Sequence, residues 1–300
     1  MATKSRRGLL LVGAAFFLFF LAVFAFVYLS LGMVRKGQLG GFGDQIGVVD
    51  LEGMIVTPKE TVKQLRRFAD DDSVKAIVLH INSPGGGAAA SEEIYREVRR
   101  IRDRKKKRVV ASIETAGASG AYYVAAGTNR IYADNASVVG SIGVIAEWYN
   151  YGDLLRWAKL KQEVIHAGEF KDIGDPARPM TPAERQLFQS MIDNMHQQFI
   201  AAVAEGRGLR IEDVKPLATG QIWTGQQALP LKLIDQIGDL RTAIDETAKS
   251  VGIAGEPSVI RAEHSNQGWL DLLLGDEASS WLPDPARLMQ KNPVFYFLWK

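Results

Sequence analysis

Hydrophobic and polar positions alternate along this chain in blocks that predict strands separated by helices. Nearly continuous apolar runs at 46–51, 74–81 and 108–114 are typical of strands buried on both faces of a parallel sheet. Apolar residues at helical spacing over 57–71, and again between the second and third runs, predict helices that connect these strands. We therefore expect an α/β fold in which flanking helices cover a parallel sheet.

Shorter elements are expected in the second half of the chain. The pattern predicts further strands at 130–133, 137–145 and 161–166. Thr181 begins a long helix as its N-cap, and Glu184 completes a capping box. Apolar residues then recur four apart, which predicts a core-facing stripe made of Leu187, Met191, Met195, Phe199 and Val203. Short helices are expected to close the domain at 211–218, 224–231 and 240–251.

The N-terminal segment has the pattern of a membrane span. Residues 8–34 contain no charged side chain. A helix of this length reaches about 40 Å, enough to cross a hydrocarbon core of about 30 Å. We expect an uncleaved transmembrane anchor at 8–34, with a cytoplasmic N-terminus at 1–7 and a glycine-rich linker at 35–45. The domain at 46–263 would then lie on the extracytoplasmic side of a bacterial-type cytoplasmic (inner) membrane, held by a single pass.

The C-terminal residues 264–300 differ from the domain before them. Apolar and aromatic clusters, among them 295–299, are interrupted by prolines. This composition predicts a tail that lies on the membrane interface or docks on the domain.

Composition narrows the chemistry that is open to the chain. It has 300 residues, a formal net charge of +2 and no cysteine, which excludes a disulfide scaffold, a thiol nucleophile and a cysteine-ligated zinc. The basic run at 104–108 has no interleaved aromatic residues, so it indicates a solvated helix end and no nucleic-acid partner.

Two of the predicted strands end in turns rich in small residues. Residues 115–123 present Ser119 between alanine and glycine, a geometry that resembles a nucleophile elbow without its usual Gly-x-Ser-x-Gly spelling. Residues 82–87, Asn-Ser-Pro-Gly-Gly-Gly, follow the strand at 74–81. Because the carboxyl ends of parallel strands line one crevice, the N–H groups of both turns could together hold a developing oxyanion.

The residue types alone do not identify the general base that would activate such a serine. A Ser-His-Asp triad would draw on one of the four histidines, His80, His166, His196 or His264. A lysine can serve only if an apolar pocket lowers its pKa from about 10.4 toward 7–8. Lys171 is one loop lysine among many by this reasoning.

Four short motifs stand out in the chain: Ile-Asn-Ser-Pro-Gly-Gly at 81–86, Ala-Ser-Gly-Ala-Tyr-Tyr at 118–123, Gly-Ser-Ile-Gly-Val-Ile at 140–145 and Phe-Lys-Asp-Ile at 170–173. Through these motifs the chain resembles the signal peptide peptidase A (SppA) proteases, membrane-anchored relatives of the ClpP/crotonase fold with a Ser-Lys dyad. The resemblance covers about residues 47–252, and the alanine at position 121 departs from the family's usual Ala-Ser-Gly-Gly.

The resemblance implies roles for five residues. Ser119 would be the nucleophile and Lys171 the general base, with Ser141 orienting the lysine ammonium. Backbone N–H groups of Gly86 and Gly120 would form the oxyanion hole. The implied enzyme is a serine endopeptidase that needs no metal and no cofactor, assembles as a homo-oligomer at the lipid bilayer, and cleaves remnant signal peptides within their apolar segments.

Three other functions remain open at this point. A related Ser-Lys protease could degrade other membrane or envelope proteins by identical chemistry. A crotonase-type acyl-CoA enzyme would use the same strand-end N–H groups on a thioester, but it would need neither an anchor nor both Ser119 and Lys171. A non-catalytic membrane scaffold would leave the dyad residues without a role.

Overall fold

The computed structural model describes residues 19–24, 43–262 and 295–298, and the fold lies in the unit that begins at Asp44. Residues 19–24 are helical. No helix among the described residues combines the length and the apolarity that crossing a bilayer requires. Most of the anchor predicted at 8–34, and most of the tail predicted at 264–300, lie outside the described residues.

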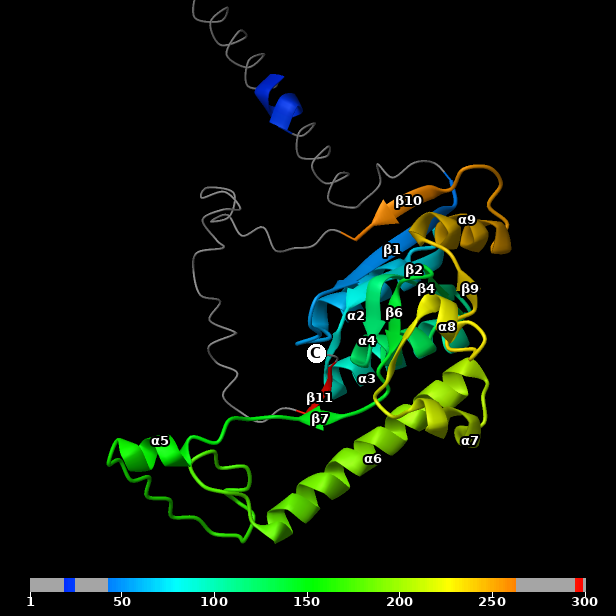
Figure 1. Ribbon diagram of the computed structural model, residues 1–300. Helices are drawn as coiled ribbons and strands as arrows, with labels where there is room; N and C mark the ends of the chain where they lie inside the picture. Colours follow the sequence, from blue (N-terminus) through cyan, green and yellow to red (C-terminus); the bar gives the residue numbers. More distant parts are fainter. Residues whose placement is uncertain (1–18, 25–42, 263–294, 299–300) are drawn as a thin grey trace, which may run out of the picture. The chain divides into compact units, whose positions relative to one another are not determined.

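A central sheet organises the domain (Figure 1). Its strand order is β10-β1-β2-β4-β5-β9, and all neighbours along this path are parallel. The strands of the path are β1 (Gln45–Glu52), β2 (Val74–Ser83), β4 (Arg108–Ala118), β5 (Arg130–Ala133), β9 (Gln236–Ile237) and β10 (Ser258–Arg261). The first part of β4 pairs with β5, and its last three residues pair with β6 (Val138–Gly140) on the same edge. β6 in turn pairs antiparallel with β8 (Ile222–Thr224). The expected parallel α/β architecture is confirmed.

Helices cover both faces of this sheet. The bounds of the helices are α2 (Lys59–Asp70), α3 (Ala88–Arg100), α4 (Gly120–Ala126), α5 (Gly152–Trp157), α6 (Pro182–Arg207), α7 (Ile211–Val214), α8 (Gly225–Ala228) and α9 (Leu240–Ser250). A π-helical turn, Ile101–Lys105, ends α3, and a 3-10 turn, Lys215–Leu217, follows α7.

The core follows from the two-residue period of the strands. In β1, Ile46 and Val48 belong to a cluster that α9 covers. Val49 and Leu51 belong to a larger cluster that holds the buried residues of α2, α3, α4 and α6. Both faces of the central strands are therefore buried, which explains their nearly continuous apolar runs.

A second, small sheet lies at the carboxyl ends of the central strands. Its strands are β3 (Gly85–Gly87), β11 (Phe295–Leu298) and β7 (Ile145–Ala146), in that order. β11 lies in the middle and is antiparallel to both neighbours. Segments from the beginning, middle and end of the domain thus meet here.

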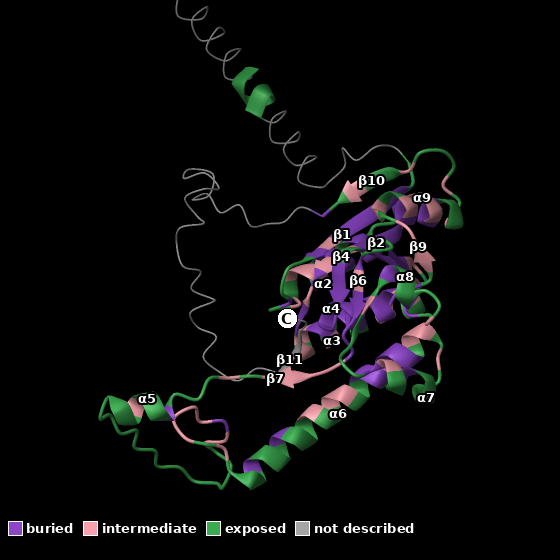
Figure 2. Cartoon of the chain, in the orientation of Figure 1, coloured by how far each residue is buried: buried purple, intermediate pink, exposed green. Residues whose placement is uncertain are grey.

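One segment projects from the domain, and we call residues 147–181 the arm. Figure 2 shows the arm and the adjoining first half of α6 as mostly exposed, while the central strands and the inner faces of the covering helices are buried. The prediction of a strand at 161–166 is wrong, because this segment is exposed and has no regular secondary structure.

The long helix corrects a second expectation. Its predicted stripe is buried at Phe199 and Val203, but Leu187 and Met191 are 37% and 38% exposed. The helix continues through Gly206 and ends before Gly208, which adopts the left-handed conformation. Gly206 allows α6 to pack closely on α4, because an added Cβ would lie 1.9 Å from the Ala126 carbonyl oxygen. The apolar stripe therefore extends beyond the part of α6 that this chain itself covers.

Candidate active site

Ser119 occupies a sharp turn between β4 and α4. Its φ of 53° and ψ of −119° lie outside the common regions for a residue with a side chain. Ala118 and Gly120 flank it, so no bulky side chain obstructs the bend. Such backbone strain, held in place by the surrounding structure, is typical of functional sites, and it matches the strained serine of a nucleophile elbow.

The helix after this turn is anchored on both sides. The buried Tyr122 hydroxyl donates to the Leu233 carbonyl at 2.7 Å, and burial raises the pKa of this phenol. The ring of Tyr123 packs edge-on against Tyr95, with ring centroids 5.0 Å apart, and at a tilt against Phe199, with centroids 4.8 Å apart. These contacts fix the direction in which the turn presents Ser119.

The Ser119 side chain is buried and unpaired. It is 1% exposed, and its Oγ has no hydrogen-bond partner. It does not cap α4 either. Leaving a buried hydroxyl unpaired costs about 1–3 kcal/mol, so the site keeps this oxygen free at the expense of stability.

No described histidine contacts Ser119. His80 lies across strands from Asp50, with Nδ1 3.0 Å from the carboxylate, and this hydrogen bond holds the pKa of Asp50 below its usual range. His166 lies in the arm beside the Gly168 carbonyl, and His196 Nε2 lies 3.3 Å from the Ile142 carbonyl. Within the described residues, the structure therefore offers no Ser-His pair.

Gly86 sits in a turn that accepts no other residue. The Ile55 N–H donates to the Gly85 carbonyl at 2.8 Å, and the Gly87 N–H donates to the Ile55 carbonyl at 2.8 Å. A Cβ at Gly86 would lie 2.2 Å from that same Ile55 oxygen. Because successive residues of a strand direct their N–H and C=O groups to opposite sides, those of Gly86 point away from Ile55.

Ser141 lies beside the Ser119 turn. Ala118 pairs with Gly140 across β4 and β6, and the Ser119 N–H donates to the Gly140 carbonyl at 2.7 Å. Ser141 also has a positive φ, 52°, and its N–H donates to the Gln221 carbonyl at 2.8 Å. Two strained serines therefore stand at adjacent strand ends.

Lys171 lies elsewhere, in the arm. Its side chain is exposed and forms no hydrogen bond or ion pair with any described residue. The arm is held to α6 through Arg178, which bonds Asp172 at 2.9 Å and also bonds Glu184. The structure thus brings together Ser119, Ser141, Gly86 and Gly120, the first residue of α4, and leaves Lys171 apart from them.

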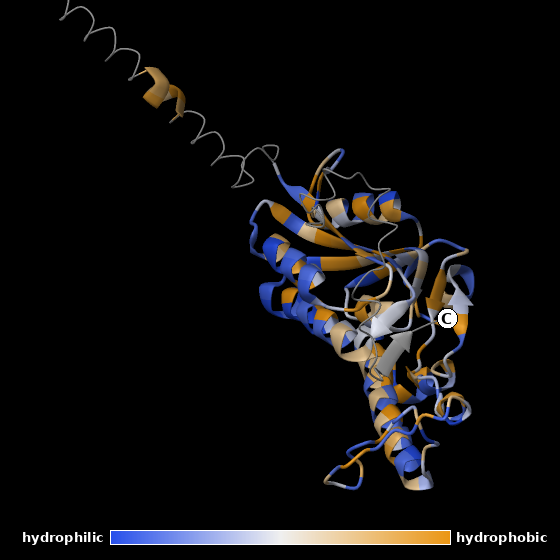
Figure 3. Ribbon diagram, turned by 90° about the vertical axis from the view of Figure 1, so that its left-hand side faces the viewer, coloured by the Kyte–Doolittle hydropathy of each residue, from blue (hydrophilic) through white to orange (hydrophobic). Residues whose placement is uncertain are grey.

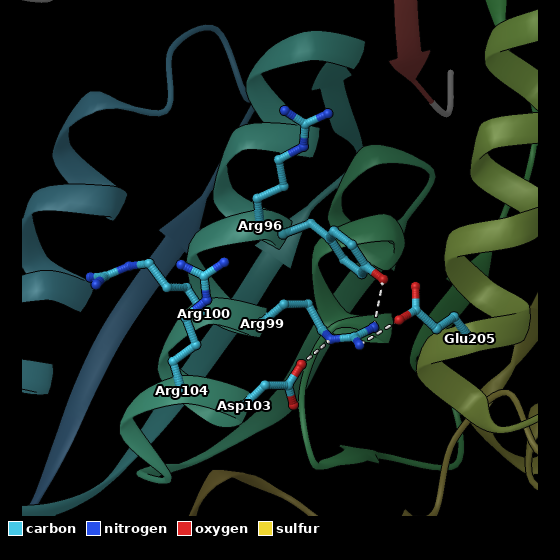
Figure 4. A pocket seen from close by; sticks show the side chains of 7 residues that line it. Arg96, Arg99, Arg100, Asp103, Arg104 and Glu205 are labelled. Carbon is cyan, nitrogen blue, oxygen red and sulfur yellow. Dashed lines mark hydrogen bonds and ion pairs between the residues drawn. The ribbon is translucent and has the colours of Figure 1, made fainter.

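An open pocket at the end of α3 lies away from these residues (Figure 4). It has a volume of 440 Å³ and lies between α3, the π-helical turn and α6. Its central side chain, Arg99, bonds Asp103, Glu205 and the Tyr95 hydroxyl. This pocket therefore contains an ion-pair network that joins two helices and none of the predicted catalytic groups.

One feature of the site is absent from the sequence-based predictions. β11 runs beside the Gly85–Gly87 turn, although more than 200 positions separate the two segments in the sequence. The aromatic and apolar run at its position is typical of a strand, and this was the available signal.

Comparisons with known proteins agree with this geometry. The family model described as peptidase family S49 matches residues 101–254, and the model described as Clp protease matches residues 54–140.

Three relatives are similar over most of the chain. A protein from Methanocaldococcus jannaschii, provisionally named as a protease, is 38% identical over 67% of this chain and 64% of its own length. A protein from Enterococcus faecium, provisionally named signal peptide peptidase SppA, is 32% identical over 73% of this chain and 63% of its own length. A protein from Synechocystis, provisionally named as a protease, is 36% identical over 70% of this chain and 75% of its own length. The match thus spans less than two thirds of the first two relatives.

Proposed function

The chain belongs to peptidase family S49, and from that membership we propose that it is a serine endopeptidase in which Ser119 and Lys171 form the catalytic pair. The observation that supports this most directly is the strained, buried turn at Ser119, whose Oγ has no partner within the described chain. A serine nucleophile must donate its hydroxyl hydrogen to a general base, and the unpaired Ser119 Oγ has that bond still to make.

The proposed reaction is covalent acyl transfer. The neutral amine of Lys171 accepts the Ser119 proton while Oγ attacks the carbonyl carbon of a peptide bond. The N–H groups of Gly86 and Gly120 stabilise the resulting oxyanion, and the lysine returns its proton to the leaving amine. Water, deprotonated by the same lysine, then releases the acyl group and restores Ser119. Ser141 holds the lysine in position during both halves.

The pair forms, in this proposal, between two copies of the chain. Lys171 is exposed on the arm, whereas Ser119 is enclosed at the end of the sheet. Figure 3 shows hydrophobic stretches along the arm and the first half of α6. The exposed apolar and aromatic residues of these segments include Tyr149, Leu154, Trp157, Leu160, Ile165, Leu187 and Met191. A second copy that covers this surface would bury the arm and enclose its lysine, so the proposed enzyme is a homo-oligomer.

The proposed substrates are remnant signal peptides. The uncharged segment at 8–34 supports a single-pass anchor that holds a ClpP/crotonase-like domain beside the extracytoplasmic face of the membrane. Signal peptides present apolar segments at that position. The name given to the Enterococcus faecium relative is in keeping with this substrate class.

Active-site labelling tests the proposal. The full-length protein in detergent is treated with a serine-reactive acyl inhibitor, and the labelled residue is located by mass spectrometry. We expect the label on Ser119, and we expect Lys171→Met to abolish it because the base is lost while the side-chain length is kept. A label that stays on Ser119 in Lys171→Met would reject the lysine as base, and an assembled protein without label at Ser119 would reject the mechanism.

A further inference from the structure

Lys171 lies in a run of tight turns at residues 168–175. Three N–H groups in this run, those of Lys171, Ile173 and Asp175, each donate to the carbonyl three residues earlier, at 3.2, 3.2 and 3.0 Å. The backbone beside the proposed base is thus wound compactly, although it belongs to no helix or strand. Turns of this kind shape the loop itself, and a separate contact must hold it to the rest of the domain.

Arg178 makes that contact through the residue that follows the proposed base. Its Nε and Nη2 lie 3.0 and 2.9 Å from Oδ2 of Asp172, and Nη2 also lies 3.4 Å from the Asp172 carbonyl oxygen. The same guanidinium donates through Nη1 to Oε2 of Glu184 at 2.9 Å, and Nη2 bonds the other oxygen of that carboxylate. One planar group therefore connects the loop that bears Lys171 to the first turn of α6.

α6 connects this attachment to the core. Glu184 also accepts the Thr181 N–H at 2.7 Å, in the capping box that begins the helix. The helix has 26 residues and is therefore about 39 Å long. Its other end lies in the core, where Phe199 and Val203 are fully buried, and Figure 1 shows it running from the arm to the helices that cover the sheet. Arg178 thus joins the loop to an element whose position the core fixes.

The same side of α6 carries the surface proposed to meet a second copy. Leu187 and Met191 follow Glu184 by three and seven residues, a spacing that places all three on one side of the helix. The two apolar side chains are exposed, whereas the side chain of Glu184 is 4% exposed. The place of Lys171 relative to this surface therefore depends on the bonds that Arg178 makes.

We propose that Arg178 is a positioning residue for Lys171, which it holds at a fixed place relative to the α6 surface that meets a second copy. This role rests on the proposed peptidase function. A catalytic pair formed between two copies needs each half fixed on its own chain, because a misplacement of about 1 Å can cost about 100-fold in rate. Arginine suits this task, since its rigid fork of N–H donors serves two carboxylates at once, whereas the ammonium of a lysine is a point charge.

Kinetics of the full-length enzyme test this role. Arg178→Lys keeps the charge and loses the fork, so kcat should fall about 10- to 100-fold while KM stays unchanged. Sedimentation velocity should show the same oligomer as wild type. Arg156→Lys is the matched control, because Arg156 is another arm arginine, paired with Asp153 and 68% exposed, and it should behave as wild type. A wild-type kcat in Arg178→Lys, a change in KM alone, or a loss of activity that accompanies dissociation would overturn the proposal.

Chemical rescue separates the fork from the charge. Arg178→Ala should lose at least as much kcat as Arg178→Lys, and millimolar methylguanidinium should raise its kcat at least about fivefold. Methylammonium at the same concentration should not, because it offers a charge without a planar set of donors. Equal rescue by both ions, or rescue by neither, would overturn the role of the fork.

Hydrogen exchange tests the contact without turnover. In Arg178→Lys, the amides of residues 168–175 should exchange at least about tenfold faster than in wild type, while those of β2 should be unchanged. Equal exchange at 168–175 in the two proteins would overturn the proposal, whatever their activity. An inactive wild-type enzyme would instead reject the peptidase function, and the exchange rates would still decide whether Arg178 fixes the loop.

Discussion

The turn at Ser119 and the arm at Lys171 carry the two halves of one proposed catalytic pair, yet the fold treats them in opposite ways. The turn is enclosed: Ser119 is 1% exposed, and two tyrosines anchor the helix that follows it. The arm is open: Lys171 is exposed and Ile165 is fully exposed. Hydrogen bonds from Arg178 to Glu184 and the packing of Trp148 on Phe188 attach the arm to α6.

This difference shows which half of the site needs a partner. A strained, buried turn keeps its geometry within one chain, because the surrounding core holds it. A lysine in water is protonated at neutral pH and accepts a proton only after an apolar enclosure forms around it. The nucleophile is therefore a product of folding, and in our proposal the base is a product of assembly.

Replacing the nucleophile should give the largest effect. Ser119→Ala should lower kcat by at least about 10⁴-fold, because the residual rate depends on the oxyanion hole and binding alone. Stability should rise by about 1 kcal/mol, since the mutation removes a buried hydroxyl without a partner and Ser119 makes no capping bond to lose. Peptide hydrolysis and urea unfolding measure the two effects. Retained turnover, or a large loss of stability, would show that the turn serves the fold and not the chemistry.

Replacing the base should give the next effect and can reveal where the pair forms. Lys171→Met should lower kcat by about 10²- to 10⁴-fold, the contribution typical of a general base, with no change in unfolding. Mixing it with Ser119→Ala in equal amounts during assembly should restore about a quarter of the activity if each site takes its serine and lysine from different copies. Lys161→Met, at another exposed lysine of the arm, is the control and should be silent. A mixture that stays inactive, after exchange of subunits is verified, would place the pair within one chain.

The two halves of α6 should respond differently to the same type of truncation. Phe199→Ala removes a fully buried ring from the core and should cost about 3–5 kcal/mol of unfolding free energy. Met191→Ala, eight positions earlier on the same stripe, should cost less than about 1 kcal/mol because this side chain is 38% exposed. It should instead weaken self-association, measured by sedimentation velocity. If Met191→Ala changes neither the degree of self-association nor the stability, the exposed apolar residues in the first half of α6 are not a subunit contact.

The sequence predicted the enclosed region far better than the open one, for a physical reason. Strands such as β2 and β4 are buried on both faces, and burial of this kind leaves nearly continuous apolar runs. The short strands β8, β9 and β10 were missed, because so few residues carry no period and their partners are distant in the chain. Val164 and Ile165 produced a false strand in the arm. An apolar residue in the sequence indicates a buried position, but the sequence does not say whether the same chain or another copy buries it.

The site divides in the same way. Small residues around Ser119 predicted its sharp turn, because only they permit the bend. Lys171 was singled out through the family resemblance and not through any local pattern. The pairing of β11 with β3 was beyond prediction, since an edge of three glycines offers no side chains from which a partner could be inferred.

The weakest expected effect concerns the attachment of the arm. Glu184 accepts hydrogen bonds from Arg178 Nη1 at 2.9 Å and from the Thr181 N–H at 2.7 Å, and these lower the pKa of its carboxyl to about 2. Because the folded pKa lies below the ordinary value, this contribution to stability is present above about pH 4.5 and is lost as the pH falls toward 2.

Glu184→Gln should therefore cost about 1 kcal/mol near pH 6, and the unfolding curves of the two proteins should converge near pH 2. Glu163→Gln, at an exposed carboxylate of the same arm, should match wild type throughout. A difference between Glu184→Gln and wild type that stays constant with pH would mean that the capping geometry, and not the charge, attaches the arm. In that case neutral hydrogen bonds and packing would attach the arm to α6, as they anchor the turn at Ser119.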